Sequence, residues 1–131
     1  MNTTPLITIA VVDDHKYVRE EISNMLLLMG FHVTIKAANG KDFLEQLSKD
    51  ESLPDLCLLD LNMPVMDGIE TAKAVKLQWP GMKILGYTFN SQEMTKMIES
   101  GADACILKCG DAMELKRTLL ELYKSSSIQN S

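Results

Sequence analysis

The chain has 131 residues, a formal net charge of −5 and 46% hydrophobic residues. This length and hydrophobic content suit one compact domain with its own core and exclude a largely disordered chain. The acidic balance argues against a nucleic-acid-binding surface, because phosphate contacts need clustered lysine and arginine. The first residues lack a basic, apolar leader, and no apolar run approaches the roughly 20 residues that span a bilayer, so we expect neither a signal peptide nor a membrane segment.

Five apolar runs alternate with five helical patterns along the chain. The runs, at residues 6–12, 31–35, 55–59, 82–87 and 104–107, predict five short strands. After the first run, Val18, Ile22 and Leu26 recur at helical spacing, and Gly30 predicts the end of that helix. The other four helices are predicted from their opening residues, which are Asn39-Gly40, Asp67-Gly68 and the capping-box patterns at 90–93 and 111–114.

Strands that alternate with helices predict a parallel α/β sheet covered on both faces, with right-handed crossovers. We expect one domain at residues 1–124, with the polar residues 125–131 forming a flexible tail or the start of a linker. The three cysteines are odd in number and have no CxxC spacing, which favours reduced thiols in a cytoplasmic protein over a disulfide or zinc site.

Five polar residues stand where the apolar runs end. Parallel strands present their carboxyl ends at one edge of a sheet, which is where ligands bind in such folds, so we expect these side chains to lie close together. They are Asp13 and Asp14 after the first run, Asp60 after the third, Thr88 after the fourth and Lys108 after the fifth. Each of these residues has an ordinary structural explanation when it is considered alone. The placement of all five at one edge of the sheet favours a functional site.

The residue types at this edge suit a divalent cation and a phosphoryl group. Oxygen ligands that include carboxylates select a hard cation, Mg²⁺ above all with Mn²⁺ as a substitute, and the backbone near Asn62 offers a further carbonyl. The carboxylate of Asp60 is a candidate nucleophile towards phosphorus. The Lys108 ammonium and the Thr88 hydroxyl are candidates to hold the phosphoryl oxygens. His15 is assigned no role, because a lone histidine at a helix start is more often a surface residue.

Together these residues resemble the receiver domain of bacterial two-component response regulators. The resemblance rests on VVDDH at 11–15, LLDLNMPVMDG at 58–68, Thr88 and GADACILK at 101–108, and it covers about residues 6–124. The Asp-Asp-His opening and the lack of proline after Lys108 are most similar to receivers of the NarL/LuxR type. The resemblance implies a single (βα)5 flavodoxin-like fold with a five-stranded parallel sheet in the order 2-1-3-4-5.

The resemblance also implies a role for each site residue. Asp60 matches the residue that receives the phosphoryl group from a histidine kinase or a histidine phosphotransfer protein. Asp13 and Asp14 match the acidic pair of the metal site, and the backbone carbonyl of Asn62 matches a Mg²⁺ ligand. Thr88 and Lys108 match the pair that binds the phosphoryl group and relays its presence. Such a domain is a signalling switch rather than an enzyme; we expect a homodimer on activation and a DNA-binding domain beyond residue 131.

Three residues depart from the usual receiver pattern. Receivers usually carry tyrosine or phenylalanine three residues before the lysine, where this chain has Cys105, so the usual aromatic switch is absent. Phe89 follows Thr88 where many receivers have a small residue, and it narrows access to the site. Cys109 replaces a frequent proline, and a cis bond before it would cost about 3 kcal/mol more than the trans form.

Three other functions compete with this interpretation. The departures at Cys105 and Phe89 leave room for a pseudo-receiver, which binds partners without phosphate chemistry. A phosphohydrolase of the haloacid dehalogenase type also uses an aspartate nucleophile, but on the first strand, and usually with a cap domain. An FMN carrier shares the sheet, but the Asp13-Asp14 pair in its first loop would repel the FMN phosphate.

Overall fold

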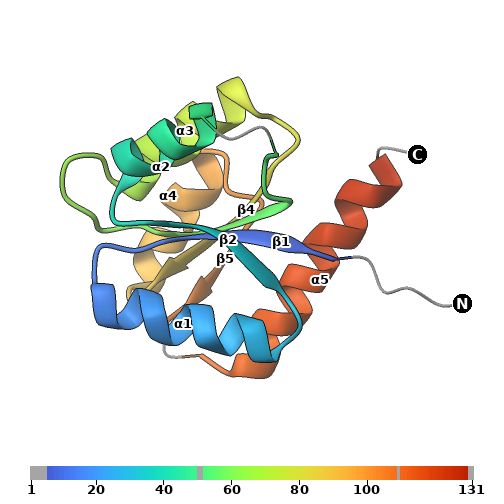
Figure 1. Cartoon of the computed structure of the whole chain (residues 1–131). Helices are drawn as coiled ribbons and strands as arrows, with labels where there is room; N and C mark the ends of the chain where they lie inside the picture. Colours follow the sequence, from blue (N-terminus) through green and yellow to red (C-terminus); the bar gives the residue numbers. More distant parts are fainter. Residues whose placement is uncertain (1–5, 50–51, 109, 130–131) are drawn as a thin grey trace, which may run out of the picture.

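The computed structural model describes residues 6–49, 52–108 and 110–129. A five-stranded sheet lies at the centre of the molecule (Figure 1), and its strands are all parallel in the order β2-β1-β3-β4-β5. The strands are β1 (Thr8–Val12), β2 (His32–Ala37), β3 (Leu56–Asp60), β4 (Lys83–Thr88) and β5 (Ala104–Leu107). Both the predicted fold class and the strand order are confirmed.

Helices cover both faces of the sheet. In Figure 1, α2, α3 and α4 lie on one face, and α1 and α5 lie on the other. Their bounds are α1 (Lys16–Leu28), α2 (Gly40–Lys49), α3 (Gly68–Gln78), α4 (Met94–Glu99) and α5 (Ala112–Gln129). No helix within the described residues is long and apolar enough to cross a membrane.

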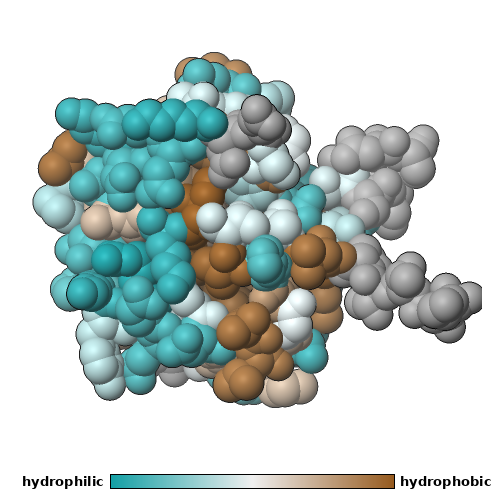
Figure 2. Space-filling view, viewed as in Figure 1, coloured by the Kyte–Doolittle hydropathy of each residue, from teal (hydrophilic) through white to brown (hydrophobic). Residues whose placement is uncertain are grey.

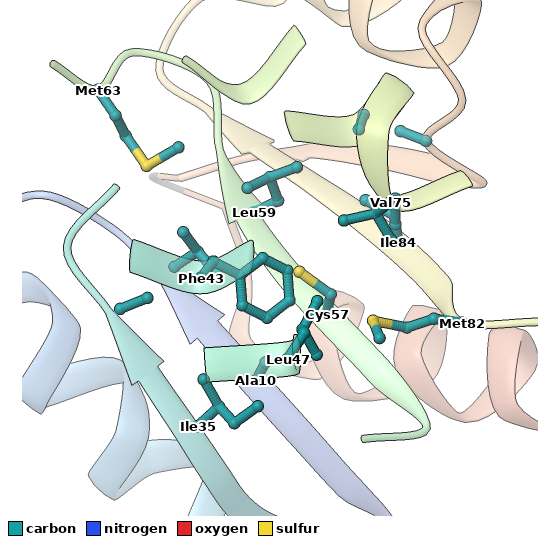
Figure 3. Packing of buried hydrophobic residues seen from close by; sticks show 14 of the residues in the cluster. Ala10, Ile35, Phe43, Leu47, Cys57, Leu59, Met63, Val75, Met82 and Ile84 are labelled. Atoms are coloured by element: carbon teal, nitrogen blue, oxygen red, sulfur yellow. The ribbon is translucent and has the colours of Figure 1, made fainter. Parts of the chain in front are cut away.

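Each face of the sheet has its own hydrophobic core, because successive strand residues point to opposite sides. The α2–α4 core includes Cys57 and Leu59 from β3, and Figure 3 shows Phe43 of α2 packed beside Cys57. The α1/α5 core takes the alternate residues of the same strand, Leu56 and Leu58. Burial on both faces explains why the strands are continuous apolar runs in the sequence.

Two predicted boundaries differ from the structure. A 3-10 turn, η1 (Ser91–Glu93), precedes α4, because the Asn90 side chain accepts a hydrogen bond from the Gln92 backbone N–H at 2.9 Å, only two residues on. Helix α5 also continues to Gln129, beyond the predicted boundary at residue 124. Serine costs only a few tenths of a kcal/mol in a helix that has already begun. The domain boundary at residue 124 stays a prediction, and residues 130–131 lie outside the described part.

A tight turn between β3 and α3 fixes the end of β3. Gly68 N–H donates to the Leu61 carbonyl at 2.8 Å, and a Cβ at Gly68 would collide with the carbonyl oxygen of Asp60. Val65, in the same turn, has a φ of 68°, a left-handed conformation that is strained for a β-branched residue. The close approach at Gly68 therefore holds the backbone of Asp60 in place at the sheet edge.

Candidate functional site

The centre of the candidate site is a buried lysine held by two carboxylates. The Lys108 ammonium lies 2.9 Å from Asp60 Oδ1 and 3.0 Å from Asp13 Oδ2. All three side chains are almost fully buried, with at most 5% of each exposed. Three strands supply them: Asp60 ends β3, Asp13 follows β1 and Lys108 follows β5.

Further hydrogen bonds fix the orientation of Asp13. Its Oδ1 accepts from the His15 backbone N–H at 2.9 Å, while its Oδ2 faces Lys108. Its backbone carbonyl accepts from the Arg19 guanidinium at 2.6 Å. Both carboxylate oxygens of Asp13 are therefore engaged by protein donors.

Asp14 differs, because its Oδ1 is buried and makes no hydrogen bond. His15 Nδ1 lies 3.1 Å from this oxygen, but no hydrogen bond joins the two atoms. Ligand atoms of Asp13, Asp14, His15 and Asp60 all lie within 4.8 Å of one another. A buried carboxylate oxygen without a donor, next to two further carboxylates, fits a hard divalent cation such as Mg²⁺.

Thr88 lies at the same edge but on the other side of the sheet. Asp60 pairs with Tyr87 in the register of β3 and β4, so the next residue, Thr88, points to the opposite face. The side chain of Thr88 is buried, and its Oγ1 accepts from the Asn90 backbone N–H at 3.2 Å. Its carbonyl accepts from the Lys108 backbone N–H at 2.8 Å, which ties β4 to the start of the Lys108 loop.

The charges at this edge shift two pKa values. Burial raises the pKa of Asp60 to about 6; Lys108 opposes this shift, and Asp13 and Asp14 add to it. Burial by itself lowers the pKa of Lys108, but Asp60 and Asp13 outweigh burial, so its pKa is raised. Lys108 therefore stays charged at neutral pH, and its charge favours the ionised form of Asp60.

A family model, the response regulator receiver domain, matches residues 9–120. The chain belongs to this family. The interpretation of the sequence as a receiver domain is thereby confirmed, and the phosphohydrolase and FMN-carrier alternatives are set aside.

Known relatives agree with this family. The response regulator protein VraR of Staphylococcus saprophyticus is 34% identical over 125 residues, and VraR of Staphylococcus aureus is 32% identical over 126 residues. Each alignment covers 93% of this chain but 59% of the relative, so the chain spans less than two thirds of the proteins it matches.

Solved structures of receiver domains share the fold. A CheY-like receiver domain protein from Methanospirillum hungatei is 25% identical, with a TM-score of 0.84 over 95% of this chain and 99% of that one. The chemotaxis response regulator CheY4 of Vibrio cholerae is 29% identical, with a TM-score of 0.79 over 90% of this chain and 99% of that one.

The structure of the receiver brings some of the predicted site residues into direct contact and leaves others apart. It joins Asp13, Asp60 and Lys108 directly, and it sets Asp14 in the same acidic cluster. Asn62 is exposed two residues beyond the end of β3. The departure at Cys109, including the bond before it, lies outside the described residues.

Sequence reasoning gave no direct place at the site to His15 or to two aromatic rings. His15 Nδ1 joins the acidic cluster, and its adjacency to Asp13 and Asp14 was the available signal. The Lys108 ammonium lies 5.6 Å from the centre of the Tyr87 ring and 5.1 Å from that of Phe89. Only the register of β3 against β4 reveals that Tyr87 stands beside Asp60.

Proposed function

We propose that this receiver domain accepts a phosphoryl group on Asp60 in the presence of Mg²⁺ and thereby switches an output surface. The observation that carries the proposal is the buried Lys108 ammonium between Asp13 and Asp60. A lysine in this position neutralises a phosphoryl group bonded to Asp60 without reorganisation of the site. Phosphoryl transfer asks the protein chiefly for such positioning and charge neutralisation.

The donor in the proposed reaction is a phosphohistidine on a kinase or a phosphotransfer protein. A carboxylate oxygen of Asp60 attacks phosphorus, the P–N bond breaks, and the imidazole leaves with the bonding electron pair and takes up a proton. The attack requires ionised Asp60, which the neighbouring Lys108 favours against burial. The Thr88 hydroxyl, at the end of β4, donates to a phosphoryl oxygen.

The acidic cluster supplies the metal site of this proposal. Asp14, Asp60 and the Asn62 backbone carbonyl would hold Mg²⁺ or Mn²⁺, with Asp13 acting through water. The buried Asp14 Oδ1, which makes no hydrogen bond, supports this assignment. When bound, the cation supplies positive charge that offsets the carboxylates and the phosphoryl oxygens.

An apolar pocket beside Lys108 suits a protein donor. The pocket has a volume of about 610 Å³, and its lining includes Val18 and Met25 of α1 together with Phe89 and Lys108. In Figure 2, apolar surface lies over the C-terminal end of α1, where Leu28 is 89% exposed. A docked kinase or phosphotransfer protein would bury this surface and bring its phosphohistidine to Asp60.

The proposed role is that of a switch rather than an enzyme. The domain promotes only its own phosphorylation and dephosphorylation, in the cytoplasm, and contacts neither nucleic acid nor membrane itself. Since the VraR relatives are longer than this chain, the output we propose is a DNA-binding domain beyond residue 131, of the NarL/LuxR type, with homodimers forming on activation.

Phosphate uptake by the purified chain tests this function. With acetyl phosphate and Mg²⁺, the wild-type chain should gain one acid-stable, alkali-labile phosphate, and chelation of Mg²⁺ should prevent the gain. Asp60→Asn should take up none, because an amide is not a comparable nucleophile. Asp55→Asn, just before the opposite end of the same strand, is the matched control and should react normally. If the wild type takes up no phosphate from acetyl phosphate or a phosphorylated kinase, the pseudo-receiver alternative replaces this proposal.

A further inference from the structure

We propose that Tyr87 is a positioning residue that holds Lys108 for the phosphoryl group. This inference rests on the proposed function, since it concerns the same lysine. Tyr87 is the last residue but one of β4, and it stands beside Asp60, with which it pairs across β3 and β4. It therefore occupies the side of the sheet on which Asp60 meets Lys108.

Tyr87 contacts both ends of the lysine residue. Its hydroxyl donates to the Lys108 backbone carbonyl at 3.1 Å. Its ring lies 5.6 Å from the Lys108 ammonium, within the range of a cation–π interaction. The Phe89 ring, at 5.1 Å, flanks the same ammonium, but Phe89 is 70% exposed whereas Tyr87 is 7% exposed. A buried ring gives the stronger interaction, because water does not compete for the charge.

These contacts matter because lysine is a flexible side chain. A lysine side chain without contacts samples many rotamers. Each contact that is lost lowers the population of the rotamer that places the ammonium next to Asp60. Asp13 and Asp60 attract the ammonium from the carboxylate side, and the hydroxyl of Tyr87 fixes the backbone from which the side chain extends. When a phosphoryl group adds to Asp60, the Tyr87 ring keeps the ammonium at the site edge.

The packing around Tyr87 allows a clean test. Its ring belongs to the α1/α5 core, which also contains Phe31. Phe31 is buried to a similar degree, but it precedes β2 at the opposite end of the sheet. Phe31→Leu therefore matches Tyr87→Leu for loss of buried aromatic surface without touching Lys108.

The test compares wild type, Tyr87→Phe, Tyr87→Leu and Phe31→Leu by NMR in the presence of Mg²⁺. The first readout is the chemical shift of the Lys108 Hε protons, which a flanking ring moves upfield. Tyr87→Leu should reduce this upfield shift to the part that the Phe89 ring causes, Tyr87→Phe should retain it, and Phe31→Leu should leave it unchanged. The second readout is the affinity for beryllofluoride, a phosphoryl mimic. Tyr87→Leu should weaken binding by about tenfold, and Tyr87→Phe by less, because it keeps the ring.

The outcomes separate the two proposals. If wild type fails to bind beryllofluoride, the proposed function fails and this inference falls with it. If wild type binds but Tyr87→Leu binds equally well, or Phe31→Leu loses as much affinity, Tyr87 is only a core residue and the positioning role is wrong. A smaller upfield shift together with a weaker affinity, found in Tyr87→Leu and not in Phe31→Leu, supports the role.

Discussion

The two sides of the sheet edge carry different parts of this receiver. On the α1/α5 side, Asp60 meets Lys108 and the ring of Tyr87. On the α4 side, small and flexible residues pack together: a Cβ on Gly86 would lie 2.9 Å from Met97 Cε and 3.0 Å from Cys105 Sγ. The charged residues therefore lie on the side of the sheet that has aromatic packing. Helix α4, which follows Thr88, packs on the other side through the unbranched side chain of Met97.

Strand register explains the difference. Gly86 pairs with Cys105 and Tyr87 pairs with Ile106, so Cys105 faces α4 while Tyr87 faces α1 and α5. The resemblance implies an aromatic residue at the position of Cys105. In this chain the buried aromatic contact with Lys108 comes from the other side of the sheet and from β4. In the proposed function, any signal from a phosphoryl group on Asp60 to α4 would therefore have to pass without a ring at Cys105.

The largest expected effect on stability comes from the α4 side. Met97 is fully buried and its Cε lies against Gly86, so Met97→Ala should lower the free energy of unfolding by about 2–4 kcal/mol. Urea denaturation measures this change, and Ile98→Ala, at a position that is 45% exposed, should cost much less. A loss below about 1 kcal/mol for Met97→Ala would mean that α4 is not anchored here.

The ionisation of Asp60 should give the next largest effect. Its pKa in the folded chain is about 6, above the ordinary 3.8, so the folded state binds the proton more tightly than the unfolded state. The carboxyl therefore costs stability at pH 7, and this cost disappears as the pH falls through 6 towards 4. In metal-free buffer, Asp60→Asn should be more stable than wild type by about 1–3 kcal/mol at pH 7.

Urea denaturation between pH 4 and pH 8 checks this prediction. The advantage of Asp60→Asn should shrink as the pH falls, and Mg²⁺ should reduce it at pH 7 by stabilising the ionised wild type. An advantage that is independent of pH would show that burial does not raise the pKa of Asp60.

A smaller effect is expected in the turn after β3. Val65 is exposed with a φ of 68°, and relief of this left-handed strain by Val65→Gly should stabilise the chain by about 0.5–1 kcal/mol after the entropy cost of glycine. Thermal unfolding measures the gain. Val65→Ala keeps a Cβ and should stay near wild type. A less stable glycine variant would show that the side chain of Val65 contributes packing that outweighs its strain.

The smallest effect on stability should come from Phe89. Because its side chain is 70% exposed, Phe89→Ala should change the free energy of unfolding by no more than about 0.5 kcal/mol. Its ring flanks Lys108, so its removal should open the site and speed phosphorylation by acetyl phosphate more than by a docked protein donor. Leu77→Ala, at an exposed position of α3 outside this pocket, is the control. Equal acceleration with both donors would remove the steric role of Phe89.

The sequence predicted most of the fold and only part of the site. Alternating apolar runs and helical patterns were sufficient for the parallel sheet, because buried strands and amphipathic helices have different periods. The same runs placed Asp13, Asp60 and Lys108 at one edge. The alternation of side chains between the two faces of a strand can be predicted from sequence, but the register that pairs residues of two neighbouring strands cannot. That is why the sequence alone does not reveal that Tyr87 stands beside Asp60.

Local boundaries were the other part that sequence reasoning missed. The short side chain of Asn90 caps a residue two positions on and produces η1, which a capping-box pattern does not distinguish from an α-helical start. The serines after Lys124 continue α5 because propagation of an existing helix is easier than its nucleation.

The position of the phosphate tests the central claim most directly. After reaction with acetyl phosphate and Mg²⁺, borohydride reduces an aspartyl phosphate to homoserine and so marks the modified residue for peptide mass spectrometry. We predict homoserine at residue 60 alone, and none when Mg²⁺ is chelated before the reaction. Homoserine at another aspartate, or an unmodified residue 60 in a chain that has taken up phosphate, would contradict the account.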